Sequence, residues 1–175
     1  MFKKIVFLFL LGAVFVTGCK KDEPSKTDVN TDKIVGEWTM TSASSNDGES
    51  VTTLNGTTIT STFTWEAKDI NAKINFKDDK TFDSYGSYTL STVTTTNGQV
   101  ITTEASTGEY QYSGTWKLNG DELETTNDTN GETGKGKILV LDDHNLKTQI
   151  KATITRNVNG GTQVATQTVI ATYTR

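Results

Sequence analysis

The chain has 175 residues, a formal net charge of −4, and a single cysteine and a single histidine. An acidic chain without a basic patch argues against nucleic acid as a partner, and one cysteine excludes an internal disulfide. Because zinc sites are built mainly from histidine and cysteine, we expect no zinc site. Oxygen-only sites remain open, but the segment Asp128–Glu132 has an incomplete calcium-loop spacing and is better explained as a Gly-bearing β-turn, so we expect no metal ion or other cofactor. The length corresponds to one domain after a processed leader.

The first 18 residues (1–18) have the form of a secretory signal peptide. Lys3 and Lys4 precede an apolar run from Ile5 to Val16, which is shorter than the about 20 residues of a transmembrane helix. The next residues, Val16-Thr17-Gly18-Cys19, resemble the bacterial lipobox. The resemblance implies that Cys19 is lipidated, carries palmitate-type acyl chains and becomes the new N-terminus. The alternative is an ordinary signal peptide followed by an incidental cysteine.

Residues 19–33 read as a lipidated flexible tether, because they are polar and contain the only proline of the chain, Pro24. Within them, Lys20-Lys21-Asp22-Glu23 resembles the acidic export signal of surface-exposed Bacteroidota lipoproteins. The resemblance implies an outer-membrane lipoprotein of the cell envelope that faces outward, and the alternative is a solvated linker. The membrane is thus the first expected partner, bound through the lipid on Cys19.

Residues 34–175 show alternation with a period of two and no helical pattern, which predicts an all-β domain. From Ile34 to Met40, alternate residues place Trp38 on the same face as Gly36. The pattern returns from Tyr112 to Leu118, where Gly114 and Trp116 share a face. Two such strands predict one apolar core, in which each glycine leaves room for the indole two residues later.

Turn residues separate the alternating runs. Hairpin turns are predicted at Asp78-Asp79-Lys80, Asn119-Gly120 and Asn159-Gly160-Gly161. Further runs lie near Val51–Glu66, Ser84–Thr95, Val100–Tyr112, Lys135–Leu141 and Leu146–Arg156. The total is about eight to ten strands, which suits a small antiparallel up-and-down β-barrel. A Greek-key sandwich remains open, because the sequence does not determine how the strands pair.

Three motifs in this body resemble the lipocalin-like domains of bacterial lipoproteins: Gly36-Glu37-Trp38, the hairpin Phe76–Phe82, and the segment Gly114–Leu123. The resemblance implies an up-and-down barrel in which an arginine, Arg156 or Arg175, covers the ring of Trp38. The long Thr- and Gly-rich segments at 42–62 and 92–107 depart from a compact version of that barrel.

Catalytic chemistry has little basis in this sequence. His144 stands in Asp142-Asp143-His144-Asn145, which has the composition of a solvated turn, so we expect no enzyme. Aromatic residues are the remaining candidates for a ligand-lining role, and the alternative is that they fill the barrel interior. The candidates are Trp65, Tyr85, Tyr88, Tyr110 and Tyr112.

These observations favour a membrane-anchored binding module for a small apolar or amphipathic molecule. The alternative is a structural or interaction subunit that docks another envelope protein and whose barrel is filled by its own side chains. An enclosed apolar void of a few hundred Å³ would favour the binding module, whereas a filled interior would favour the interaction subunit.

Overall fold

The computed structural model describes residues 31–175 apart from 130, 132 and 159. The predicted signal peptide, Cys19 and most of the tether lie outside these residues. The predicted all-β class is confirmed, since the described residues form nine strands and a single 3-10 turn. These elements are η1 (Thr31–Lys33), β1 (Gly36–Leu54), β2 (Thr57–Phe76), β3 (Thr81–Thr96), β4 (Gln99–Ser106), β5 (Tyr110–Asn119), β6 (Glu122–Asn127), β7 (Thr133–Leu141), β8 (Asn145–Val158) and β9 (Gly161–Thr174).

The strands form one antiparallel sheet in the order β2-β1-β9-β8-β7-β6-β5-β3-β4, and an additional pairing of β2 with β3 closes it in a ring. The sheet is therefore barrel-like, and nine strands agree with the predicted eight to ten. Strands adjacent in sequence pair with each other, with one exception. Strands β4 and β5 do not pair together, because both pair with β3.

Gly86 marks the point where β3 changes its neighbour. Residues 81–86 of β3 pair with β5, and residues 89–96 pair with β4. Gly86 has φ +126°, and a Cβ there would lie 2.0 Å from the carbonyl oxygen of Asn71. Only glycine tolerates this backbone conformation and this close approach of the neighbouring strand.

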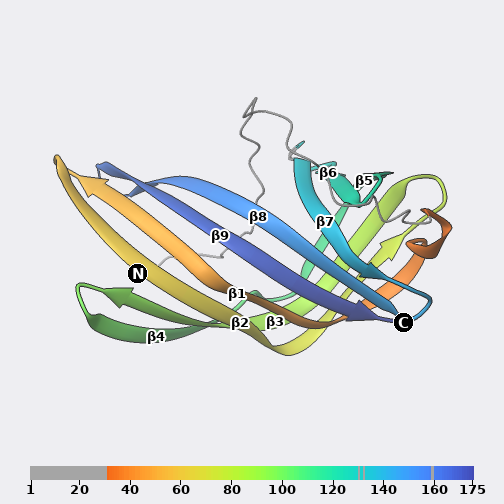
Figure 1. Cartoon of the computed structure of the whole chain (residues 1–175), viewed down its shortest axis with the longest axis horizontal. Helices are drawn as coiled ribbons and strands as arrows, with labels where there is room; N and C mark the ends of the chain where they lie inside the picture. The colour runs from red at the N-terminus through yellow and green to blue at the C-terminus, as the bar shows by residue number, and fades with distance from the viewer. Residues whose placement is uncertain (1–30, 130, 132, 159) are drawn as a thin grey trace, which may run out of the picture.

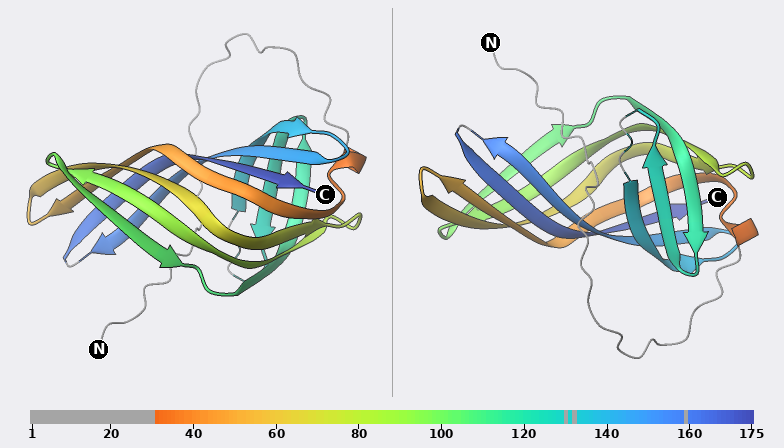
Figure 2. Two further views of the ribbon diagram at one scale, coloured as in Figure 1. Left: turned by 90° about the horizontal axis from the view of Figure 1, so that it is seen from below. Right: turned by 90° about the horizontal axis from the view of Figure 1, so that it is seen from above.

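The change of neighbour divides the molecule into two halves (Figures 1 and 2). In the ring half, β5, β6 and β7 bridge β3 and β8. In the open half, the hairpins β1–β2, β3–β4 and β8–β9 extend beyond them and form a curved sheet. The segments 42–62 and 92–107, which depart from the compact pattern, contribute much of this open half.

The core of the ring half surrounds Trp38, which is fully buried. Its indole Nε1 donates a hydrogen bond to the carbonyl oxygen of Ile34 at 2.7 Å. The guanidinium carbon of Arg175 lies 4.3 Å from the centre of the ring, within the range of a cation–π interaction. Arg175 also donates to the carbonyl oxygens of Val35 and Asp143. Of the two arginines considered for this position, Arg175 therefore occupies it.

The second Gly-x-Trp strand completes the same core, because Trp116 belongs to the cluster of Trp38. A Cβ on Gly114 would lie 2.0 Å from the carbonyl oxygen of Thr126, so this glycine allows β6 to approach closely. The indole of Trp116 packs edge-on against Phe76 and donates to the carbonyl oxygen of Lys77 at 3.1 Å. Each indole thus has a hydrogen-bond partner, as burial requires.

Candidate binding site

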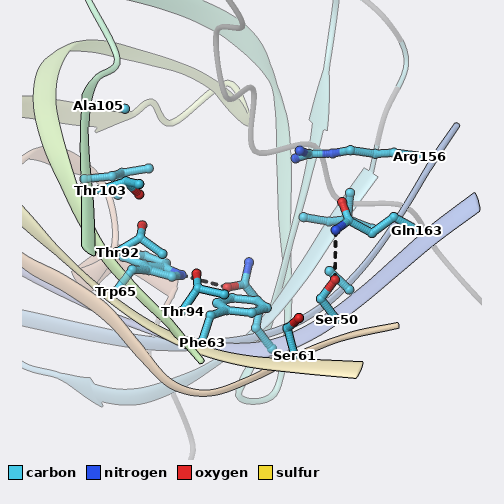
Figure 3. Close-up of a pocket in the computed structure, with 14 residues that line it drawn as sticks. Ser50, Ser61, Phe63, Trp65, Thr92, Thr94, Thr103, Ala105, Arg156 and Gln163 are labelled. Carbon is cyan, nitrogen blue, oxygen red and sulfur yellow. Dashed lines mark hydrogen bonds between the residues drawn. The ribbon is translucent and has the colours of Figure 1, made fainter. Parts of the chain in front are cut away.

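The open half contains a cavity of about 250 Å³ between its inner faces (Figure 3). Six strands line it: β1, β2, β3, β4, β8 and β9. Its apolar lining consists of Phe63, Trp65, Leu90, Ala105, Ile154 and Ala165. Its polar lining consists of Ser50, Ser61, Thr92, Thr94, Thr103, Arg156, Gln163 and Gln167.

Phe63 and Trp65 form the aromatic floor of the cavity. The position of Phe63 depends on a glycine of the neighbouring strand. Gly48 of β1 pairs with Phe63 of β2, and a Cβ on Gly48 would lie 2.3 Å from the ring of Phe63. Because Gly48 has no side chain, the phenyl ring of Phe63 can pack against the backbone of β1. A larger residue would push the ring toward the cavity.

Trp65, the second aromatic residue of the floor, is held by a buried hydrogen bond. Its indole Nε1 donates to Oε1 of Gln167 at 2.7 Å, and both residues are buried. Because this oxygen serves the indole, a ligand would meet the Gln167 amide through its NH₂ group. The bond fixes the orientation of the ring that a ligand would contact.

A bulge beside Gln167 is fixed by Asp47. The register between β1 and β9 shifts between Ser45 and Glu49, which leaves the backbone N–H of Thr168 to donate to Asp47 at 2.7 Å. Hydrogen bonds from the side chain and then the backbone of Thr168 hold the pKa of Asp47 below its usual value. The carboxylate thus replaces a missing ladder partner at the bulge.

Hydroxyl and amide groups form the opposite part of the lining, toward the hairpin tips. The Nε2 of Gln163 donates to the hydroxyls of Ser50 at 2.9 Å and Thr52 at 3.3 Å. Ser61 and Thr96 share a hydrogen bond of 2.6 Å. The cavity is therefore apolar around Phe63 and Trp65 and hydrogen-bonding at the end near the hairpin tips, an arrangement that suits an amphipathic molecule.

Arg156 is the only charged residue among those that line the cavity. It is half-buried, and Figure 3 shows its guanidinium extending over the cavity toward the side that carries Thr103. A guanidinium can form paired hydrogen bonds with a carboxylate, sulfonate or phosphate. The chain is acidic as a whole, yet this site presents a positive charge.

Of the five aromatic candidates, only Trp65 lines the cavity. Tyr88, Tyr110 and Tyr112 form a group of rings, with centroids of neighbouring rings 6.1 Å and 5.3 Å apart. Tyr88 also packs against the buried cluster that contains Trp65, and burial raises the pKa of Tyr88 to about 12. Tyr85 is exposed and donates to Glu37 at 2.6 Å. Tyr88, Tyr110 and Tyr112 therefore pack beside the cavity without lining it, and Tyr85 lies on the outer surface of the sheet.

Outside the cavity, the structure places the only histidine of the chain and a second, smaller cavity. His144 is exposed in the turn between β7 and β8, where its backbone N–H donates to Oδ1 of Asp142 at 2.8 Å. Among the residues that the structure describes, no three His, Cys, Asp or Glu side chains lie close enough together to hold a metal ion. A smaller cavity of about 120 Å³ lies in the ring half, between residues that include Ile74, Leu146 and Tyr173.

Comparison of the chain with models of known families, with curated proteins and with solved structures finds no match. Over residues 31–175, without the three omitted positions, no helix is long and apolar enough to cross a membrane. The fold and the site define an all-β protein with a cavity in each half, of which the one in the open half is the larger. The chemistry of the open half is the basis for assigning a function.

Proposed function

We propose that this protein is an outer-membrane lipoprotein of the cell envelope whose lipocalin-like domain binds a small apolar or amphipathic molecule, without catalysing a reaction. The observation that carries the proposal is the cavity of about 250 Å³ in the open half. Its apolar floor and its polar end near the hairpin tips match the two ends of an amphipathic ligand. Its volume lies just below the usual range of ligand pockets, about 300–1,000 Å³, and therefore favours a small ligand.

The division of the molecule also supports a binding role. Trp38, Phe76 and Trp116 already supply a large buried core in the ring half. Trp65 and Phe63 are therefore not the only large side chains on which the fold depends. A fully filled interior would favour a purely structural subunit, and the open half departs from that arrangement.

Ala165→Phe is expected to block the cavity, because Ala165 lines it from β9 and a phenyl ring would occupy much of its volume. A suitable probe is the amphipathic anion 8-anilinonaphthalene-1-sulfonate, whose fluorescence rises in an apolar site. We expect its affinity to fall about tenfold or more, the loss of about 1.4 kcal/mol or more of binding free energy.

Val164→Phe is the matched control for this experiment. Val164 neighbours Ala165 on the same strand but points to the opposite face, and it is already exposed. The control should bind the probe as the parent does. Equal binding by the parent, Ala165→Phe and Val164→Phe would show that the probe lies elsewhere and would contradict the proposed site.

Cys19→Ala is expected to abolish lipid attachment, because a thiol is required for the thioether that carries the acyl chains. Burial of acyl chains contributes about 0.8 kcal/mol per CH₂, so the variant should leave the membrane fraction or remain unprocessed. Metabolic labelling with a fatty-acid analogue measures the attachment. Labelling of the alanine variant at the level of the parent would refute the lipoprotein assignment.

A further inference from the structure

Two unpaired strand edges flank the cavity. Strand β4 pairs with β3 along its whole length, and its other edge has no partner among the described strands. Strand β8 pairs with β7 only through residues 146–150, so residues 151–158 pair on one side alone, with β9. Thr103 and Ala105 of β4 and Ile154 and Arg156 of β8 line the same cavity. The two edges therefore border one opening.

The edge of β4 lacks the features that usually prevent edge pairing. Free edges are commonly protected by lysine, proline or a bulge. Residues 99–106 contain no lysine and no proline, and the register between β3 and β4 is regular throughout. Val100 and Ile101 on this edge are 64% and 59% exposed, more than any other large hydrophobic residue that the structure describes.

The charge of the open half also permits close approach of another open half. Residues 51–65 and 92–103 carry no charged side chain. The free edges themselves carry three charges, namely Glu104 on β4, which is paired with Lys68 at 3.3 Å, and Lys151 and Arg156 on β8. The net charge of −4 would keep two copies apart elsewhere on the surface, whereas the two free edges together are not net negative, so they are the part of the molecule best suited to meet a second copy.

The strand directions fit a two-fold symmetric pair. A two-fold axis perpendicular to the strands, through the opening, reverses every strand of the second copy. It would place β4 antiparallel to the partner's β4 and β8 antiparallel to the partner's β8 at once, as a self-complementary interface requires.

We propose that two copies of this chain associate through the free edges of β4 and β8, so that their open halves face each other and enclose one shared chamber. Each edge then gains a ladder of backbone hydrogen bonds, and Val100 and Ile101, on opposite faces of β4, each gain cross-strand neighbours. Arg156 of each copy lines the shared chamber. The association does not depend on the proposed ligand, because it uses the backbone edges and not the cavity surface.

Three matched threonine-to-lysine variants of the full chain in detergent micelles test the dimer. Thr102 on β4 and Thr153 on β8 lie on the free edges and point away from the cavity, since their neighbours Thr103 and Ile154 line it. Thr62 on β2 is exposed on the same outer face, but its strand is paired on both sides with Glu49 and Thr95. The mass of the protein component is measured by sedimentation equilibrium.

We expect the parent and Thr62→Lys to have the mass of two chains at about 100 µM, where a dimer of micromolar Kd is nearly complete. Thr102→Lys and Thr153→Lys should each raise the dimer Kd about tenfold or more, because each variant brings a lysine from both copies into one paired edge, where lysine opposes edge pairing. A monomeric parent, or edge variants that dimerise as Thr62→Lys does, would overturn the proposal.

Cysteine scanning supplies a second readout that does not require dissociation. In a two-fold antiparallel pair of edges, one residue lies opposite its own copy at a Cα distance of about 4.5–5.5 Å, which a disulfide can span. In a Cys19→Ala background, one of positions 100–104 replaced by cysteine should therefore form a covalent dimer on mild oxidation, whereas Thr62→Cys should not. Absence of a covalent dimer at all five positions would contradict pairing through β4.

Discussion

Replacing Trp38 by alanine is expected to lower the free energy of unfolding by about 3–5 kcal/mol, the usual cost of truncating a buried tryptophan. Trp38 is fully buried in the ring half. The change would leave a cavity, remove the indole N–H that donates to the carbonyl oxygen of Ile34 and remove the cation–π partner of Arg175. A domain of ordinary stability has only about 5–15 kcal/mol to lose.

The measurement is urea unfolding of the chain from Lys20 onward, followed by circular dichroism because the variant lacks one fluorophore. Tyr85→Ala is the control, since Tyr85 is exposed and bonded only at the outer surface to Glu37. It should cost about 1 kcal/mol or less, as surface substitutions do. A Trp38→Ala midpoint as close to the parent as that of Tyr85→Ala would mean that Trp38 does not centre the core.

Gly86→Ala should cost at least about 3 kcal/mol, from backbone strain and overpacking together. The residue has φ +126°, and its Cβ would lie 2.0 Å from the oxygen of Asn71 and 2.6 Å from the Cα of Ala72. Both contacts are with the backbone of β2, so neither can be relieved by a change of rotamer. The two strands would have to separate where β3 changes its partner.

Gly98→Ala separates the two contributions to this cost. Gly98 also has a positive φ, +78°, but nothing lies within 4 Å of its Cβ position. It should therefore lose only about 1 kcal/mol, from the backbone conformation alone. Urea midpoints of the two variants provide the comparison. Similar losses for Gly86→Ala and Gly98→Ala would show that the close approach of β2 and β3 is not essential to the fold.

Local turn chemistry explains the parts of the fold that could be predicted. The turn at 78–80 lies between β2 and β3 as expected, and Gly120 begins the turn between β5 and β6, although Asn119 still belongs to β5 and does not have a positive φ. The third predicted turn falls where β8 ends at Val158 and β9 begins at Gly161. The run Val51–Glu66, predicted as one strand, contains the turn Asn55-Gly56, and the tip Asn97-Gly98 was also missed. All four of these residues have positive φ. The Asn-Gly pair that identified Asn119-Gly120 could have located both.

Strand pairing could not be predicted, because it depends on contacts between distant segments. The sequence shows β3 as one alternating run and does not indicate that its two halves pair with different strands. That change depends on Gly86 opposite Ala72, a contact between residues of two strands that no local pattern reveals. The division into a ring half and an open half follows from it.

The site was predicted least well, because the candidate residues were chosen for their aromatic rings and not for the face of the strand on which they lie. Alternation along β2 places Ser61, Phe63 and Trp65 on one face, and all three line the cavity. Applying the same period to β9 identifies Gln163, Ala165 and Gln167. Knowing which runs face a shared cavity required the pairing, so the serine, threonine and glutamine lining remained hidden.

The three indole N–H groups provide the most direct test of whether the ligand binds in the open half and not in the core of the ring half. Trp65 lines the cavity, whereas Trp38 and Trp116 belong to the core of the ring half. Two-dimensional ¹H–¹⁵N NMR spectra would be recorded during titration with 8-anilinonaphthalene-1-sulfonate, with each indole signal assigned by a Trp→Phe variant. The account predicts a saturable shift of the Trp65 indole signal while the signals of Trp38 and Trp116 stay in place. A saturable shift of the Trp38 or Trp116 signal without one at Trp65, or no saturable shift at all, would contradict it.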